Sequence, residues 1–118
     1  LRFGESKMIH TVKDGVEIGE KSGKNNVLGL ADLYHVYGND DNIEEIVSLK
    51  NKVYHSHIAE PVNRTYPFAT DSDEVKAIYK AFISALKKSG CETISIEART
   101  DDYANDIKNS VNFLREII

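Results

Sequence analysis

Three short apolar segments alternate along this chain with segments of helical periodicity, and this alternation constrains the fold more than any other feature. The strand-like segments are residues 27–31, 53–59 and 92–97. Strands that alternate with helices form βαβ units, whose right-handed crossovers place the strands in parallel within one sheet. The sequence therefore predicts an α/β fold in a single domain, residues 1–118, built on three parallel strands.

Four amphipathic helices are expected around these strands. The clearest lies between Asp71 and Gly90, where six apolar residues follow the spacing of one helix face. They are Val75, Ile78, Tyr79, Phe82, Ile83 and Leu86. Asp71, with Glu74 three residues later, indicates a capping pair, and Gly90 is typical of a helix end. The other three helices are expected at residues 5–24, 40–47 and 101–118.

The predicted sheet is small for a complete domain. Sheets have about five or six strands on average, and a parallel sheet of three strands leaves two edges unpaired. The chain also opens with Leu1 rather than with an initiator methionine. Together these features predict a piece of a larger α/β protein, and its exposed edges favour a homo-oligomer.

Charge and cysteine content argue against several classes of protein. Nineteen acidic and fifteen basic residues give a net charge of −4, which does not suit a protein that coats nucleic acid or a membrane surface, because phosphates would not attract it. No apolar run is long enough for a membrane span. The single cysteine, Cys91, permits neither an intrachain disulfide nor an all-cysteine metal site. No secretory leader opens the chain, so a cytoplasmic location is expected.

Residues capable of chemistry gather near the carboxyl ends of the three predicted strands. They are Asp32 and His35 for the first strand, His55, His57, Glu60 and Arg64 for the second, and Glu97 and Arg99 for the third. Ligands bind at the carboxyl edge of a parallel sheet because successive loops converge there. Aspartate, histidine and glutamate at one edge form a mixed oxygen and nitrogen ligand set, which suits Mn²⁺, Mg²⁺ or Co²⁺.

Each of these residues also has a purely structural interpretation. An aspartate at a strand end commonly caps the following segment, and one of two histidines on a strand face is commonly held by a structural hydrogen bond. A loop arginine is more often a solvated charge. Glu97 differs, because it alternates with Ile94 and Ile96 and is expected to face a barrel interior. A lone carboxylate is costly there unless it is paired or bound to a metal.

Three motifs carry a resemblance to a known family. The pattern D-x-x-H spans Asp32 to His35, H-x-H-x-x-E-x-x-x-R spans His55 to Arg64, and I-x-I-E ends at Glu97. In this combination the chain resembles the sugar phosphate isomerase/epimerase family, whose members are xylose-isomerase-like TIM barrels and include tagatose and psicose 3-epimerases. The resemblance covers nearly the whole chain. It implies that residues 1–118 are the carboxyl-terminal part of a TIM (β/α)8 barrel.

The resemblance also implies a metal site. In this family Glu, Asp, His and Glu from four strands hold a divalent metal, and Asp32, His57 and Glu97 match the last three. The first glutamate is expected before Leu1. Three ligands alone are expected to hold Mn²⁺, Mg²⁺ or Co²⁺ only weakly or not at all.

The same resemblance implies substrate contacts and a reaction. His35 and Arg64 match residues that bind substrate oxygens, and Glu5 is expected to match a further substrate-contacting carboxylate. Family members exchange a proton at a sugar carbon through an enediolate, with one carboxylate on each face of the ketose. Glu97 is expected to be one of this pair. The parent is therefore expected to be an isomerase or epimerase of a small sugar or sugar phosphate, and this chain alone to be inactive.

Two alternatives stay open at this point. Apurinic endonucleases share the barrel, but they need more histidine ligands and a basic face for DNA phosphates. The four histidines and net charge of −4 in this chain count against that activity. A half-barrel could instead act only as a non-catalytic assembly module that pairs through its exposed strands. Neither the sugar nor the metal can be chosen from the sequence.

Overall fold

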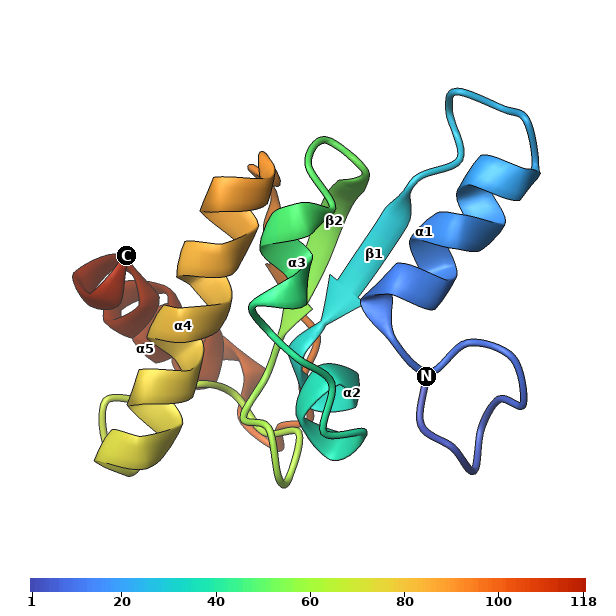
Figure 1. Cartoon of the computed structure of the whole chain (residues 1–118). Helices are drawn as coiled ribbons and strands as arrows, with labels where there is room; N and C mark the ends of the chain where they lie inside the picture. Colours follow the sequence, from blue (N-terminus) through green and yellow to red (C-terminus); the bar gives the residue numbers. More distant parts are fainter.

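One parallel sheet of three strands, in the order β1-β2-β3, forms the centre of the structure, a computed structural model that describes residues 1–118 (Figure 1). The strands are β1 (Gly29–Asp32), β2 (Val53–Ile58) and β3 (Ile94–Ile96). The helices are α1 (Val12–Lys21), α2 (Leu33–Gly38), α3 (Glu45–Ser48), α4 (Asp73–Ser89) and α5 (Tyr103–Ile117). The predicted α/β class and the three parallel strands are therefore confirmed.

The register of the sheet decides which side chains share a face. Asp32 pairs with His57, and His57 pairs with Ser95. Residues in register on parallel strands lie on the same face of the sheet. Pairing continues past β3, because the backbone N–H of Glu97 donates to the carbonyl of Ile58 at 3.2 Å. Asp32, His57 and Glu97 therefore lie on one face, at the carboxyl end of the sheet.

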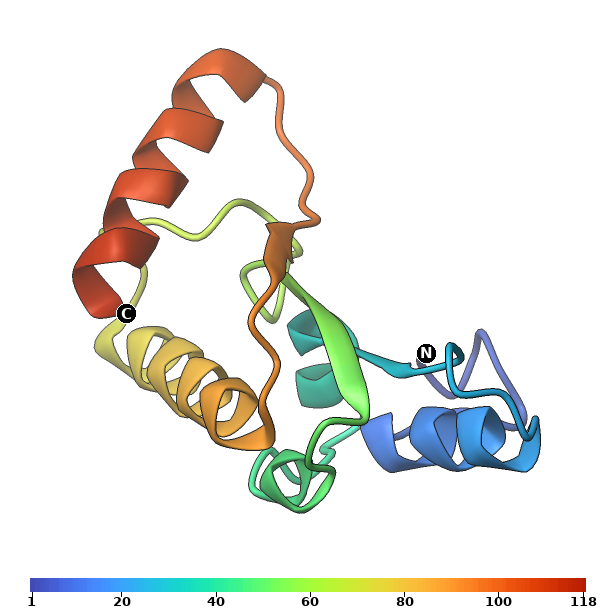
Figure 2. The same cartoon turned by 90° about the horizontal axis from the view of Figure 1, so that it is seen from above.

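The other face of the sheet packs against helices. Figure 2 shows α1, α3 and α4 along one side of the strands, with α5 beyond β3. The seventeen buried core residues come from these elements, α2 and the adjoining loops. Tyr79 and Phe82 on α4 are fully buried, as is Ile58 on β2, on the helix-facing side of the sheet. The apolar stripe predicted for this helix is thus its core face.

Local hydrogen bonds explain where the helices begin and end. Thr11 and Asp14 form a capping box that starts α1. Ser72 caps α4 by accepting the N–H of Val75 at 3.2 Å. Gly90 ends α4 with a φ of 90°, a left-handed conformation that a side chain would strain.

Three helix predictions need correction. The first helix starts at Val12 rather than at Glu5, because the Thr11 capping box defines its amino end. The chain has five helices rather than four, since α2 follows β1 directly. The cap of α4 is Ser72 rather than the predicted Asp71, whose carboxylate accepts the Tyr79 hydroxyl instead. None of the helices is long and apolar enough to cross a membrane.

Candidate functional site

Asp32 stands where β1 ends and α2 begins, and its two carboxylate oxygens have different partners. Oδ1 accepts the backbone N–H of Tyr34 at 2.9 Å and that of His35 at 3.4 Å, which caps α2. Oδ2 faces the carboxyl edge of the sheet, 3.6 Å from His57 Nδ1. The buried Asp32 side chain can therefore cap α2 with one oxygen and offer the other as a metal ligand.

Asp32, His57 and Glu97 bring one possible ligand atom each to within 4.8 Å of one another. His57 Nδ1 lies 2.5 Å from Glu97 Oε2. Two ligand atoms that share an ion at about 2.1 Å can be at most about 4.2 Å apart. A small side-chain adjustment would therefore bring all three atoms around one divalent cation, and their oxygen and nitrogen chemistry suits such an ion.

The two histidines of β2 have different surroundings, although both lie on the same face. His55 Nε2 lies 3.0 Å from the hydroxyl of Ser95, within hydrogen-bond distance. The His57 ring meets the His55 ring edge-on, with 5.3 Å between the centroids. The structure thus places His57 in the carboxylate cluster and His55 against the neighbouring strand.

Arg64 reaches the same cluster from the loop after β2. Its Nη2 lies 2.6 Å from Glu97 Oε1 and 3.5 Å from Asp32 Oδ2. The Glu60 carboxylate folds this loop by accepting the backbone N–H groups of Val62 and Asn63 at 3.1 and 2.5 Å. Glu60, which the sequence only places near the strand end, therefore organises the loop that carries Arg64.

His35 and Glu5 form the side of the site that borders α2. His35 Nε2 lies 3.8 Å from Asp32 Oδ2, and its Nδ1 lies 3.4 Å from Glu5 Oε2 without hydrogen-bond geometry. Burial lowers the pKa of His35, which favours the neutral imidazole. The hydrogen bond from the Arg2 backbone lowers the pKa of Glu5. All six predicted site residues thus lie around one edge of the sheet.

Comparison with known proteins identifies the family to which this arrangement belongs. The sequence profile of the xylose isomerase-like TIM barrel family matches residues 3–117. The chain belongs to the xylose isomerase-like TIM barrel family. No curated protein sequence matches it.

Solved structures show the same fold in longer chains. A D-psicose 3-epimerase is similar with a TM-score of 0.81 and 20% identity, over 99% of this chain and 47% of that one. An L-ribulose 3-epimerase has a TM-score of 0.76 and 18% identity, over 95% and 43%. A 3-keto-D-glucoside 4-epimerase from E. coli has a TM-score of 0.74 and 23% identity, over 94% and 41%. The chain thus spans less than half the length of each of these structurally similar proteins.

Membership in this TIM barrel family is consistent with the position of the cluster. Active sites of such barrels lie at the carboxyl ends of the strands. The three parallel strands of this chain form part of a barrel, and the cluster lies at their carboxyl ends. Family membership confirms the predicted fold, whereas the role of each side chain stays a proposal.

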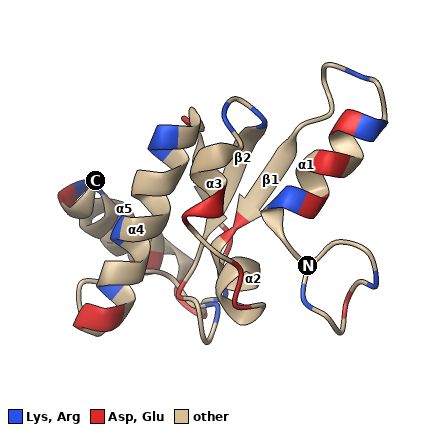
Figure 3. Ribbon diagram, viewed as in Figure 1, with Lys and Arg blue, Asp and Glu red and all other residues tan.

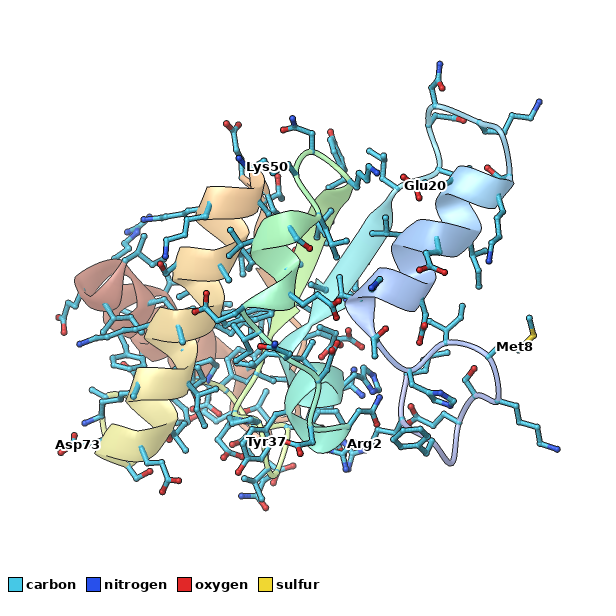
Figure 4. All side chains as sticks on the ribbon, viewed as in Figure 1. Arg2, Met8, Glu20, Tyr37, Lys50 and Asp73 are labelled. Atoms are coloured by element: carbon cyan, nitrogen blue, oxygen red, sulfur yellow. The ribbon has the colours of Figure 1, made fainter.

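Tyr34 and Arg2 adjoin the site, and sequence reasoning did not single them out. The Arg64 guanidinium carbon lies 4.9 Å from the centre of the Tyr34 ring, and that of Arg2 lies 3.7 Å from it. Arg2 lies beside α2 (Figure 4). These stacking contacts join residues at least thirty positions apart, so no local pattern could indicate them.

Proposed function

We propose that this chain supplies part of the active site of a divalent-metal-dependent sugar isomerase or epimerase. The observation that carries the proposal is the meeting of Asp32, His57 and Glu97 at the carboxyl edge of the sheet. Three chain segments far apart in sequence bring two carboxylates and an imidazole together here, and one of the carboxylates, Asp32, is buried. A divalent cation would explain this placement.

Asp32, His57 and Glu97 would hold the cation, with Mn²⁺, Mg²⁺ and Co²⁺ as the candidates. When bound, such an ion stabilises the negative charge that develops on neighbouring substrate oxygens. His57 Nδ1 faces both carboxylates, so this nitrogen would add a third ligand to their two oxygens.

Glu97 is the proposed proton carrier. Its carboxylate is half-exposed, so it can reach a substrate, while Arg64 and His57 hold its two oxygens. It would remove a proton from a ketose carbon and leave an enediolate, to which a proton then returns. One carboxylate serves one face of the sugar. We therefore propose that the second carboxylate comes from another segment of a complete barrel, and that this chain alone is inactive.

The remaining polar residues would orient the substrate. Arg64 and the neutral His35 present donors toward the carboxyl edge of the sheet, and Glu5 adds an acceptor at 3.4 Å from the imidazole. Such a donor and acceptor set matches the hydroxyl and carbonyl groups of a small sugar or sugar phosphate. The similar solved structures, which are epimerases of psicose, ribulose and a ketoglucoside, support this substrate class.

The distribution of charge supports a sugar rather than a nucleic acid as the substrate. Lysine residues alternate with aspartate and glutamate along α1, so charges of both signs lie on this helix (Figure 3). The net charge of −4 adds no attraction for phosphate backbones. An endonuclease function therefore has less support than a sugar isomerase function.

The metal site can be tested by titrating the chain with Mn²⁺ in a calorimeter. The His57→Ala variant is expected to lose Mn²⁺ binding, because it removes the only nitrogen ligand. His55→Ala is the matched control: it removes an imidazole from the same strand and face, and it should bind as the original chain does. Circular dichroism in EDTA should show folded protein for both variants.

Two results would contradict the proposal. Undiminished Mn²⁺ binding by His57→Ala would show that the ligand assignment is wrong. The substrate class is tested separately, by adding D-psicose to the Mg²⁺-loaded chain and following the imidazole NMR signals of His35. The ketose should shift these signals, and unchanged signals with D-psicose and D-fructose would contradict a sugar site.

A further inference from the structure

We propose that Arg64 is a built-in counter-cation of the carboxylate cluster, which a divalent ion has to displace, and that Tyr34 is the positioning residue that holds it there. The inference rests on the proposed metal site. It adds that the metal-free site is already neutralised by the chain itself. It also adds that cation binding frees the guanidinium for a second partner.

Arg64 pairs with both carboxylates that a metal would use. Its Nη2 lies 2.6 Å from Glu97 Oε1 and 3.5 Å from Asp32 Oδ2. The other Glu97 oxygen lies 2.5 Å from His57 Nδ1. Both Glu97 oxygens therefore have close partners in the absence of metal, and a cation at this carboxylate would compete with the Arg64 guanidinium for its negative charge.

The electrostatics of the cluster require a positive charge in the absence of metal. Asp32 is buried, and an uncompensated buried carboxylate is costly. Arg64 is the one permanently charged side chain that forms ion pairs with both Asp32 and Glu97. A divalent ion at the same carboxylates would take over this compensation. The like charges of ion and guanidinium would then repel each other, so Arg64 would leave.

The backbone of Arg64 is anchored by hydrogen bonds, so the proposed displacement requires only its side chain to move. The backbone N–H of Arg64 donates to the Glu60 carbonyl at 2.9 Å, and its carbonyl accepts the N–H of Arg99 at 2.8 Å. Its φ of 58° is left-handed, a conformation that persists when the surrounding contacts hold it. Displacement of the guanidinium is therefore a side-chain rotation about a fixed anchor.

Tyr34 provides the surface on which the guanidinium rests. The Arg64 guanidinium carbon lies 4.9 Å from the centre of the ring, within cation–π range. The backbone of Tyr34 is fixed at the start of α2, because Asp32 Oδ1 accepts the Tyr34 N–H at 2.9 Å. The same aspartate therefore positions Tyr34 with one oxygen and attracts Arg64 with the other.

Arg2 holds the Tyr34 ring from the amino-terminal segment. Its guanidinium carbon lies 3.7 Å from the ring centre, and its Nη2 donates to the Tyr34 carbonyl at 3.4 Å. It packs against Gly38, where a Cβ would lie 2.6 Å from Arg2 Nε. The Arg2 contact is thus the tighter of the two stacking contacts. Tyr34 stays in place with Arg2 when Arg64 leaves.

Displacement would couple the two parts of the proposed site. With metal present, the guanidinium released from Glu97 can donate to sugar oxygens instead, because its anchor lies beside the same carboxylates. Glu97 would at the same time exchange an arginine contact for a metal contact. The expected order of binding is therefore the cation first and the sugar second.

The test is a calorimetric Mn²⁺ titration of charge variants at Arg64. Arg64→Gln keeps a long polar side chain without the charge, and its Mn²⁺ affinity should rise about tenfold because no cation has to be displaced, which corresponds to about 1.4 kcal/mol. Arg64→Lys keeps the charge and should bind more weakly than Arg64→Gln. Arg99→Gln is the matched control: it removes the same charge from an exposed neighbouring position and should leave the affinity unchanged.

The role of Tyr34 is tested by one aromatic and one aliphatic substitution at this position. Tyr34→Phe keeps the aromatic face and should bind Mn²⁺ like the original chain. Tyr34→Leu removes that face, so Arg64 is held less firmly and the affinity should rise toward that of Arg64→Gln. In the Arg64→Gln background, Tyr34→Leu should change the affinity no further. An equal increase in both backgrounds would mean that Tyr34 acts only through general loosening of the fold.

The outcomes separate this inference from the proposed metal site. If Arg64→Gln binds Mn²⁺ no more tightly than the original chain, the metal site stands and displacement is wrong. If neither protein binds Mn²⁺, the three ligands of this chain hold no cation by themselves, and displacement of Arg64 in this chain is wrong. Thermal melting in EDTA tests the counter-cation directly. Arg64→Gln should lower the melting temperature of the original chain, and the same substitution in a Glu97→Gln background should lower it less. Strictly additive shifts would contradict an Arg64–Glu97 pairing in the metal-free chain.

Discussion

At the scale of single residues, burial moves the pKa values of two aromatic side chains in opposite directions. It lowers the pKa of His35, because the charged imidazolium is the form that loses hydration. It raises the pKa of Tyr79, because there the charged form is the phenolate. The Tyr79 hydroxyl donates to Asp71 Oδ2 at 2.7 Å, which further disfavours ionisation. Each side chain is therefore held in its neutral form at neutral pH.

The Tyr79→Phe variant should lose less stability than the original chain at alkaline pH. Tyrosine in the unfolded chain ionises near its ordinary value of 10.0, whereas buried Tyr79 stays protonated above it. The unfolded state then binds fewer protons, so the free energy of unfolding falls with rising pH, by up to about 1.4 kcal/mol per pH unit for one group.

Urea denaturation at pH 8 and at pH 10.5 to 11 would measure this difference. Tyr103→Phe is the control, because Tyr103 is 66% exposed and lies outside the core. Identical alkaline losses for Tyr79→Phe and Tyr103→Phe would contradict the assigned shift.

At the scale of elements, the junction of β1 and α2 links folding to the candidate chemistry. The strand ends at Asp32, and the helix starts at the next residue because Asp32 Oδ1 caps it. The short α2 has little stability of its own, since helices below about 12 residues are marginal in isolation. Its cap and its buried residues Leu33 and Val36 therefore determine whether it forms.

Two substitutions separate the cap from the charge of Asp32. Asp32→Asn keeps an oxygen that can cap α2, so it should stay close to the original stability in EDTA, whereas Asp32→Ala should lose about 1 kcal/mol more. Both should lose Mn²⁺ binding, because neither has a carboxylate. Urea denaturation and calorimetry measure the two properties. Equal stability of the two variants would mean that the cap contributes nothing.

At the scale of the whole molecule, the sheet is covered on one face only. The helices pack on one side, while Leu30, which shares the other face with Asp32, is 46% exposed. β1 and β3 are both edge strands, since each pairs only with β2. Exposed apolar side chains beside unpaired strand edges favour association with another chain.

We therefore expect this chain to self-associate, and analytical ultracentrifugation should show a mass above 13.3 kDa that increases with protein concentration. Leu30→Lys should weaken the association, because it places a charge on the uncovered face. Val62→Lys is the control, since it adds the same charge at an exposed loop position. A monomer at every concentration, or equal effects of the two lysines, would contradict association through the sheet.

The sequence by itself determined the α/β class, the parallel strands and the core face of α4, because these follow from short-range periodicity. It also indicated a site at the carboxyl edge, since strand ends are readable and parallel strands bring their carboxyl ends together. The resemblance to a known family then selected Asp32, His57 and Glu97 from the candidates at that edge. It did not indicate α2, because that helix depends on a cap formed by a single aspartate oxygen.

Only the tertiary structure decided which partners the site residues have. The two histidines of β2 look alike in sequence, yet Ser95 of the next strand engages His55 and the carboxylates surround His57. The stacking of Arg64 on Tyr34 likewise joins a loop to a helix from another part of the chain. Such contacts depend on distances across elements, and sequence periodicity carries no information about those distances.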